Sequence, residues 1–133
     1  MIGIQLWKDG QKGTLDPLLF SKVAEELALQ MKQDFEKRKR VNKRTQIRKF
    51  YDEVLRLNML VRERPRQWDA IKPQVHMLTA KAAYAEGRDL VSDNFRKFVK
   101  DAVDQIDTPE DLNVFSNLFE AFMGFYRLHG PRN

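Results

Sequence analysis

Cysteine is absent from this 133-residue sequence, and no stretch approaches the run of about 18 apolar residues that a membrane-spanning helix needs. The lack of cysteine excludes disulfide frameworks, thiolate zinc sites and cysteine nucleophiles, and it fits a reducing compartment. The first residues also lack the basic leader and apolar run of an export signal. We therefore expect a cytoplasmic protein without a membrane partner.

Motifs that bind nucleotides or metals are also missing. The six glycines are scattered or terminal, whereas a phosphate-binding loop needs glycines close together. The two histidines, His76 and His129, lie far apart and lack the spacing of metal ligands on one helix. The sequence therefore predicts no metal site and no cofactor.

Acidic residues cluster between positions 101 and 111 and are the only candidates for catalytic acid–base groups. Asp101 and Asp104 each follow a lysine by four residues, which favours surface ion pairs on a helix. Glu110 and Asp111 follow Thr108-Pro109, at a helix start where acids are expected whatever the function. We therefore expect no catalytic residues and no enzyme activity.

Positive charge is concentrated in one third of the chain. Residues 32–66 hold thirteen Lys or Arg against five Asp or Glu, whereas the rest holds eleven against fourteen. Its densest part is Lys37 to Arg40, followed by Lys43, Arg44, Arg48 and Lys49. Such a patch is typical of a protein that binds a polyanion, and phosphate contact needs little beyond cations spaced along a surface.

Apolar residues recur at helical spacing along most of the sequence, and no alternating strand pattern of useful length occurs. We predict an all-α protein, a compact bundle of about five helices in one domain. After an N-terminal arm at 1–15, the expected helices span about 17–40, 45–63, 67–86, 92–106 and 109–129.

Residues 18–64 contain neither Gly nor Pro, so the first two helices can also fuse into one rod. Such a rod could exchange between protomers, which gives a helix-swapped or elongated dimer as the alternative to the compact form.

The last predicted helix carries more apolar residues than one buried face requires. On a helical wheel, the apolar arc is extended by Val114, Leu118, Ala121 and Phe125. We expect these four residues to form a contact surface for another protein subunit.

Three stretches occur in order: Thr45 to Tyr51 (TQIRKFY), Lys81 to Arg88 (KAAYAEGR), and Phe119 to Ala121 (FEA) leading to Phe125-Tyr126. Together they resemble the small subunit of the type III-A CRISPR effector, the Csm complex. The resemblance spans about residues 42–126 and does not include the basic run from Lys37 to Arg40.

This resemblance implies a non-catalytic subunit of an RNA-guided antiviral defence complex. Its copies would stack as a short filament beside the other Csm subunits and line the channel that holds guide RNA paired to target RNA. Because base pairing reads the sequence, the protein need only hold the RNA backbone.

The resemblance places RNA-binding cations at Arg48 and Lys49 in the first stretch and at Lys81 and Arg88 in the second. Lys43, Arg44 and Arg56 join this set by proximity. Tyr84 is a candidate for stacking on a base or ribose, although a tyrosine at helical spacing is more often part of the core.

Two other functions remain open from the sequence. A helix-turn-helix DNA-binding regulator would need a short turn, often with Gly, before its reading helix, whereas residues 62–66 read Arg-Glu-Arg-Pro-Arg. A helical adaptor would use the basic patch to bind an acidic protein.

Overall fold

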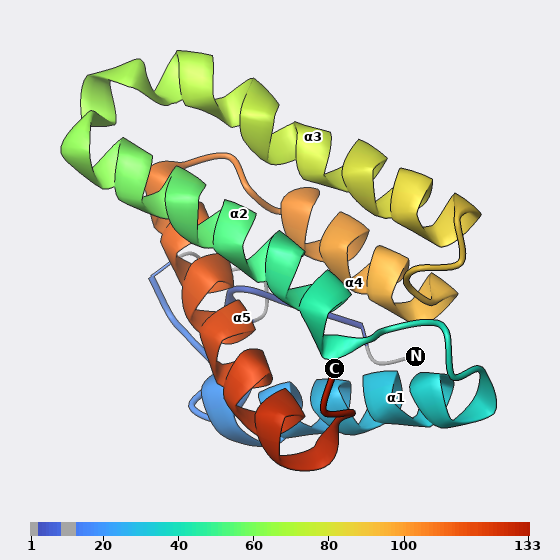
Figure 1. Cartoon of the computed structure of the whole chain (residues 1–133). Coiled ribbons are helices and arrows are strands. Elements are labelled where there is room, and N and C mark those ends of the chain that lie inside the picture. The colour runs from blue at the N-terminus through green and yellow to red at the C-terminus, as the bar shows by residue number, and fades with distance from the viewer. Residues whose placement is uncertain (1–2, 9–12) are drawn as a thin grey trace.

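Five α-helices make up the computed structural model, which describes residues 3–8 and 13–133 (Figure 1). They are preceded by a π-helical turn, η2 (Leu19–Val23), and a 3₁₀ turn, η3 (Pro65–Gln67), links the second helix to the third. No strand occurs in the described ranges, so the all-α prediction is confirmed. The helices are α1 (Ala24–Lys37), α2 (Arg44–Glu63), α3 (Trp68–Gly87), α4 (Asp93–Val103) and α5 (Pro109–His129).

The last two helices begin at side-chain caps that the sequence shows. Ser92 caps α4, and its hydroxyl accepts a 3.2 Å hydrogen bond from the backbone N–H of Phe95. Thr108 and Asp111 form a capping box at the start of α5, with Pro109 in the first turn. Each cap satisfies backbone donors that have no partner inside the helix.

The first helix is shorter than the sequence predicts. It opens with the wide turn η2, and α1 then ends at Lys37 instead of about residue 40, because Arg38 adopts an extended backbone. Asn42, which precedes α2, has a φ of 60°. Left-handed backbone cannot continue a right-handed helix. Helices α1 and α2 are therefore separate here, not fused into one rod.

Helix α5 is the centre of the bundle. It packs against both α1 and α2, while α3 packs on α4 and forms a hairpin with α2 (Figure 1). A row of rings along α5 meets the phenylalanines of α4: the ring centroids of Phe98 and Phe119 are 5.5 Å apart, and those of Phe98 and Phe122 are 5.7 Å apart. Aromatic pairs in this range add specific contacts to the burial of apolar area.

The apolar surplus of α5 is absorbed within the chain. Leu118 is fully buried and Val114 is 5% exposed. The prediction that these two residues contact another subunit is therefore wrong, because α1 and α2 cover α5 from different sides. Ala121 and Phe125 are only partly buried, so they are the part of the expected surface that a partner can reach.

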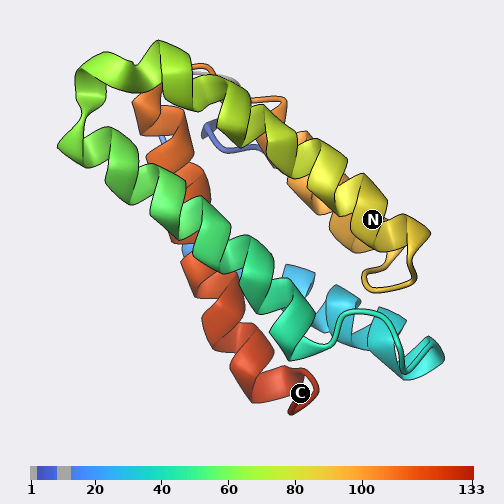
Figure 2. The ribbon, with the colours of Figure 1, turned by 45° about the horizontal axis from the view of Figure 1, so that its top comes forward.

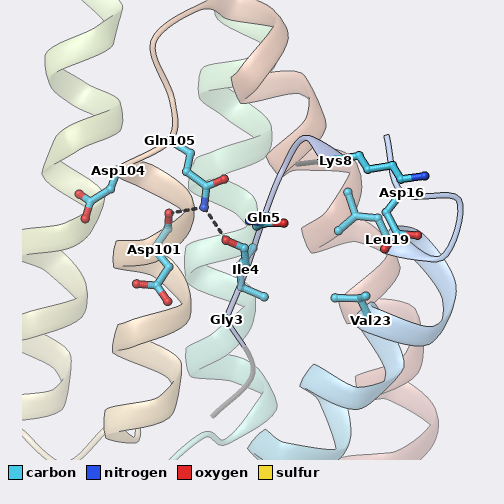
Figure 3. Close-up of a pocket in the computed structure, with 10 residues that line it drawn as sticks. All are labelled: Gly3, Ile4, Gln5, Lys8, Asp16, Leu19, Val23, Asp101, Asp104 and Gln105. Carbon is cyan, nitrogen blue, oxygen red and sulfur yellow. Dashed lines mark hydrogen bonds between the residues drawn. The ribbon is translucent and has the colours of Figure 1, made fainter. Parts of the chain in front are cut away.

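Residues 3–8 of the N-terminal arm pack against the bundle. Ile4 and Leu6 are buried. Gln105 holds their backbone: its Oε1 accepts from the Leu6 N–H at 2.9 Å. Its Nε2 donates to the Ile4 carbonyl at 2.6 Å (Figure 3). The Trp7 indole N–H donates a 2.7 Å bond to Asp111 Oδ1. The rest of the predicted arm includes residues 1–2 and 9–12, which lie outside the described residues.

Candidate nucleic-acid interface

Helices α2 and α3 meet at η3 and diverge away from it (Figure 2). A groove lies between them. The groove has a volume of about 410 Å³. It is lined by Gln46, Lys49, Phe50 and Glu53 from α2, by Leu78, Lys81, Tyr84, Ala85 and Arg88 from α3, and by Leu90 beyond α3.

The floor of the groove is apolar and its rim is charged. Phe50, Leu78 and Ala85 are each at most 8% exposed, so they belong to the core as well as to the groove. Phe95 of α4 supports the floor from below, with its ring edge-on to Phe50 at a centroid distance of 5.2 Å. Through this ring contact and its packing on α3, α4 underlies the floor of the groove.

Four residues predicted from the sequence meet in this groove: Lys49, Lys81, Tyr84 and Arg88. Tyr84 is 67% exposed, so it is not the core residue that helical spacing favours. The Arg88 guanidinium lies 5.6 Å from the centre of the Tyr84 ring. A tyrosine with an arginine over its ring is an arrangement that can stack on a nucleobase.

Glu53 places one negative charge among these cations, and sequence reasoning missed it. Its carboxylate accepts hydrogen bonds from Arg56 at 2.8 and 2.9 Å and from Lys81 at 3.4 Å. The hydrogen bonds from Arg56 lower the pKa of Glu53, so the carboxylate is ionised at neutral pH. Arg56 also donates to Gln74 at 3.2 Å and is not among the groove's lining residues. Only the three-residue spacing of Glu53 and Arg56 hinted at their pairing.

The other predicted cations lie outside the groove. Arg48 is exposed beside Asp52, with 3.9 Å between Nε and Oδ1. Lys43 is exposed just before α2. Arg44 is tied to the last residues of the chain: its backbone N–H donates to the Asn133 carbonyl at 2.6 Å, and its guanidinium bonds the Arg132 carbonyl. The seven predicted cations therefore do not form one continuous cluster.

The basic run after α1 is partly neutralised by Asp89, which lies just beyond α3. Arg38 forms a 2.7 Å ion pair with Asp89, and Arg40 lies 3.8 Å from the same carboxylate. The hydrogen bond from Arg38 lowers the pKa of Asp89. Lys39 instead covers the Phe35 ring at 5.0 Å. Because Asp89 directly follows Arg88, this run adjoins one end of the groove.

A larger cavity, of about 720 Å³, lies between the arm, η2 and the end of α4 (Figure 3). Its charged lining residues are Lys8, Asp16, Asp101 and Asp104. No group of three His, Cys, Asp or Glu suited to a metal occurs among residues 3–8 and 13–133. Within the same ranges, no helix is long and apolar enough to cross a bilayer.

The chain matches a known protein family. Residues 16–132 match the family described as Csm2 Type III-A. The chain belongs to this family. Csm2 proteins are small structural subunits of the type III-A CRISPR Csm complex, so the predicted resemblance is confirmed. No curated protein and no solved structure is significantly similar to the chain.

The Csm2 match includes α1 to α5 and leaves out residues 1–15. All four predicted residues of the groove therefore lie in the part of the chain that defines the family. The buried Leu6 and the partly buried Trp7 of the arm precede the match, so their packing against the bundle lies outside it.

Proposed function

We propose that the groove between α2 and α3 binds the backbone of guide RNA and target RNA in the Csm complex, without reading their sequence. The observation that carries this proposal is the meeting of Lys49, Lys81 and Arg88, from two helices, around one groove with an exposed Tyr84. Cations spaced along such a groove neutralise successive phosphates.

The subunit's own contribution is structural and not catalytic. The charged groups of the groove are cations and one carboxylate, Glu53, whose pKa is lowered by Arg56. A carboxylate with a lowered pKa is a weak general base, because a good base has a pKa near the working pH. The groove is therefore suited to holding phosphates, in a cytoplasmic ribonucleoprotein.

A titration of the full chain tests this proposal. Fluorescence anisotropy would follow duplex RNA, duplex DNA and single strands at two salt concentrations. We expect weak binding that falls steeply with salt, and its loss in the triple variant Lys49→Ala, Lys81→Ala, Arg88→Ala. A preference for one DNA operator that persists at high salt would support a regulator. Absence of binding at low salt would support an adaptor.

The arrangement of α2 and α3 supports RNA-backbone binding over the DNA-binding regulator. In a helix-turn-helix the two helices cross at about 90–120° after a turn of three or four residues. Here α2 and α3 return alongside each other as a hairpin through a turn that contains Pro65 (Figure 2). The α2–α3 pair therefore does not present a reading helix.

We infer that other subunits, including copies of this chain, contact the outer face of α3. Exposed residues with small or apolar side chains recur there at three- and four-residue spacing: Ala70, Pro73, Met77, Ala80 and Tyr84. That spacing is typical of a seam between helices. The buried row of α3 lies on its other side, so this face has no partner among the described residues.

A further inference from the structure

We propose that the α2–α3 groove receives one unpaired nucleobase and that it prefers guanine. This inference rests on the proposed function, because RNA must first be held at the groove by its backbone. It adds a base-selective contact to a surface that otherwise recognises only phosphates.

The apolar parts of the groove have no use in phosphate binding. Phe50, Leu78 and Ala85 form a buried floor, and Tyr84 offers an aromatic ring that is 67% exposed. A nucleobase has two apolar faces and stacks on such rings. The volume of about 410 Å³ falls in the range of sites that hold small ligands. The groove therefore fits a base better than it fits a bare backbone.

Glu53 determines which base is preferred. An ionised carboxylate only accepts hydrogen bonds, and it has about four acceptor positions. Among the RNA bases, guanine presents two adjacent N–H donors, N1–H and N2–H, on its pairing edge. Adenine and cytosine place a ring acceptor beside their amine, and uracil has one N–H between two carbonyls. Guanine is thus the base that a carboxylate can bind through two parallel hydrogen bonds.

The charges around Glu53 suit a bound nucleotide. Arg56 occupies two acceptor positions of Glu53 at 2.8 and 2.9 Å, and the contact from Lys81 is longer, at 3.4 Å. Because Arg56 binds both Glu53 oxygens, two parallel bonds from guanine require Arg56 as well as Lys81 to turn toward the phosphates of the strand, and both side chains are more than half exposed. Lys49 and Arg88, on the same rim, are available for flanking phosphates.

A base inside a duplex cannot enter this groove, because its pairing edge is already occupied. The nucleotide must come from a single strand or be displaced from its helix. Duplex RNA should therefore bind through phosphates alone, and a single strand through phosphates and the base.

The test compares labelled ten-nucleotide oligouridine RNAs in which one central position is guanosine, inosine, adenosine or, in the uridine strand, uridine. Full-length protein is titrated with each RNA and with a duplex of the same length, and anisotropy is recorded. We expect the guanosine strand to bind about tenfold more tightly than the uridine strand. Inosine lacks the N2 amine and should fall between them.

Two variants separate base binding from phosphate binding. Glu53→Gln removes a negative charge, so it should strengthen duplex binding while it abolishes the preference for guanosine. Tyr84→Ala should weaken single strands much more than it weakens duplex RNA, and Tyr84→Phe should restore single-strand binding. Arg48→Ala, outside the groove, should keep the preference for guanosine.

Equal affinities for the guanosine, inosine and uridine strands would overturn the base-pocket proposal, as would a preference for guanosine that survives Glu53→Gln. In either case, salt-sensitive duplex binding that requires Lys49 would leave the proposed function standing. If no RNA binds at low salt, the proposed function itself fails.

Discussion

The hydroxyl of Tyr126 donates a 2.6 Å hydrogen bond to the backbone carbonyl of Asn42, and this bond joins the end of α5 to the turn before α2. The Asn42 side chain donates to Ser92 Oγ at 2.9 Å and accepts from the Ser92 N–H at 2.9 Å. The Asn42 N–H donates to the carbonyl of Leu90, which lines the groove. This buried junction therefore fixes one end of the groove to α5.

Loss of the Tyr126 hydroxyl should destabilise the fold. In Tyr126→Phe the buried carbonyl of Asn42 loses a donor, which typically costs about 1 to 3 kcal/mol. Urea unfolding followed by circular dichroism measures the change. Tyr84→Phe is the matched control, because Tyr84 is exposed and its hydroxyl makes only a 3.4 Å contact with Arg88. A destabilisation equal to that of the control would contradict this role of the junction.

Alkaline pH should destabilise the protein through the same side chain. Burial, with a smaller contribution from the charge of Asp34, raises the pKa of Tyr126 above its ordinary value of 10.0. Above about pH 10 the unfolded chain ionises this tyrosine while the folded chain keeps it protonated, so the free energy of unfolding falls as pH rises. Tyr126→Phe should show a shallower fall between pH 9 and 11 in urea titrations. If the free energies of unfolding of the unsubstituted protein and Tyr126→Phe fall in parallel as pH rises, Tyr126 is not the cause of the alkaline destabilisation.

The sequence predicted those parts of the fold that depend on neighbours in the chain. The caps Ser92 and Thr108 act three residues away, so the starts of α4 and α5 were readable. The end of α1 could not be predicted in this way, because Asn42 makes its stabilising contacts with Ser92, fifty residues later. Periodicity likewise showed that α5 has a broad apolar surface, but not that two helices cover it.

The candidate site was predictable only in part, for the same reason. The resemblance named Lys49, Lys81, Tyr84 and Arg88, which do line one groove. It also named Arg48, which adjoins Lys49 in sequence. Successive residues of a helix point about 100° apart, so Arg48 lies outside the groove that Lys49 lines. The carboxylate of Glu53 stands among these cations through the packing of α3 on α2, which no local pattern reports.

Neighbouring cations on α2 should differ in their effect on RNA binding. Lys49→Ala removes a charge from the groove, so it should weaken binding of all RNA duplexes and reduce the slope of log Kd against log salt by about 1. Arg48→Ala removes the same charge from the same helix outside the groove, and it should change the slope much less. Anisotropy titrations at several salt concentrations provide the measurement, and melting temperatures confirm that both variants fold. Equal losses of affinity would show that the RNA does not follow the groove.

Charge placed on the outer face of α3 should block assembly without unfolding the chain. Met77 is 52% exposed, and a substitution at such a surface usually changes stability by no more than about 0.5 kcal/mol. If a helix of a neighbouring subunit packs along this face, Met77→Glu buries an unpaired carboxylate at the contact, which is strongly unfavourable. Co-expression with the other Csm subunits, followed by native mass spectrometry, measures how many copies of the variant enter the complex. We expect a marked loss.

Met59→Glu is the matched control for Met77→Glu, because Met59 is also 52% exposed but lies on α2, away from the outer row of α3. The same change of a methionine to a carboxylate there should leave incorporation intact. Phe125→Glu tests the partly buried surface of α5 in the same assay. If Phe125→Glu prevents incorporation in a folded chain while Met77→Glu does not, the neighbouring subunit contacts α5 and the outer face of α3 is free. If Met77→Glu alone prevents incorporation, the contact lies on the outer face of α3. Tyr84 belongs both to that face and to the groove, so the neighbouring subunit then lies directly beside the RNA.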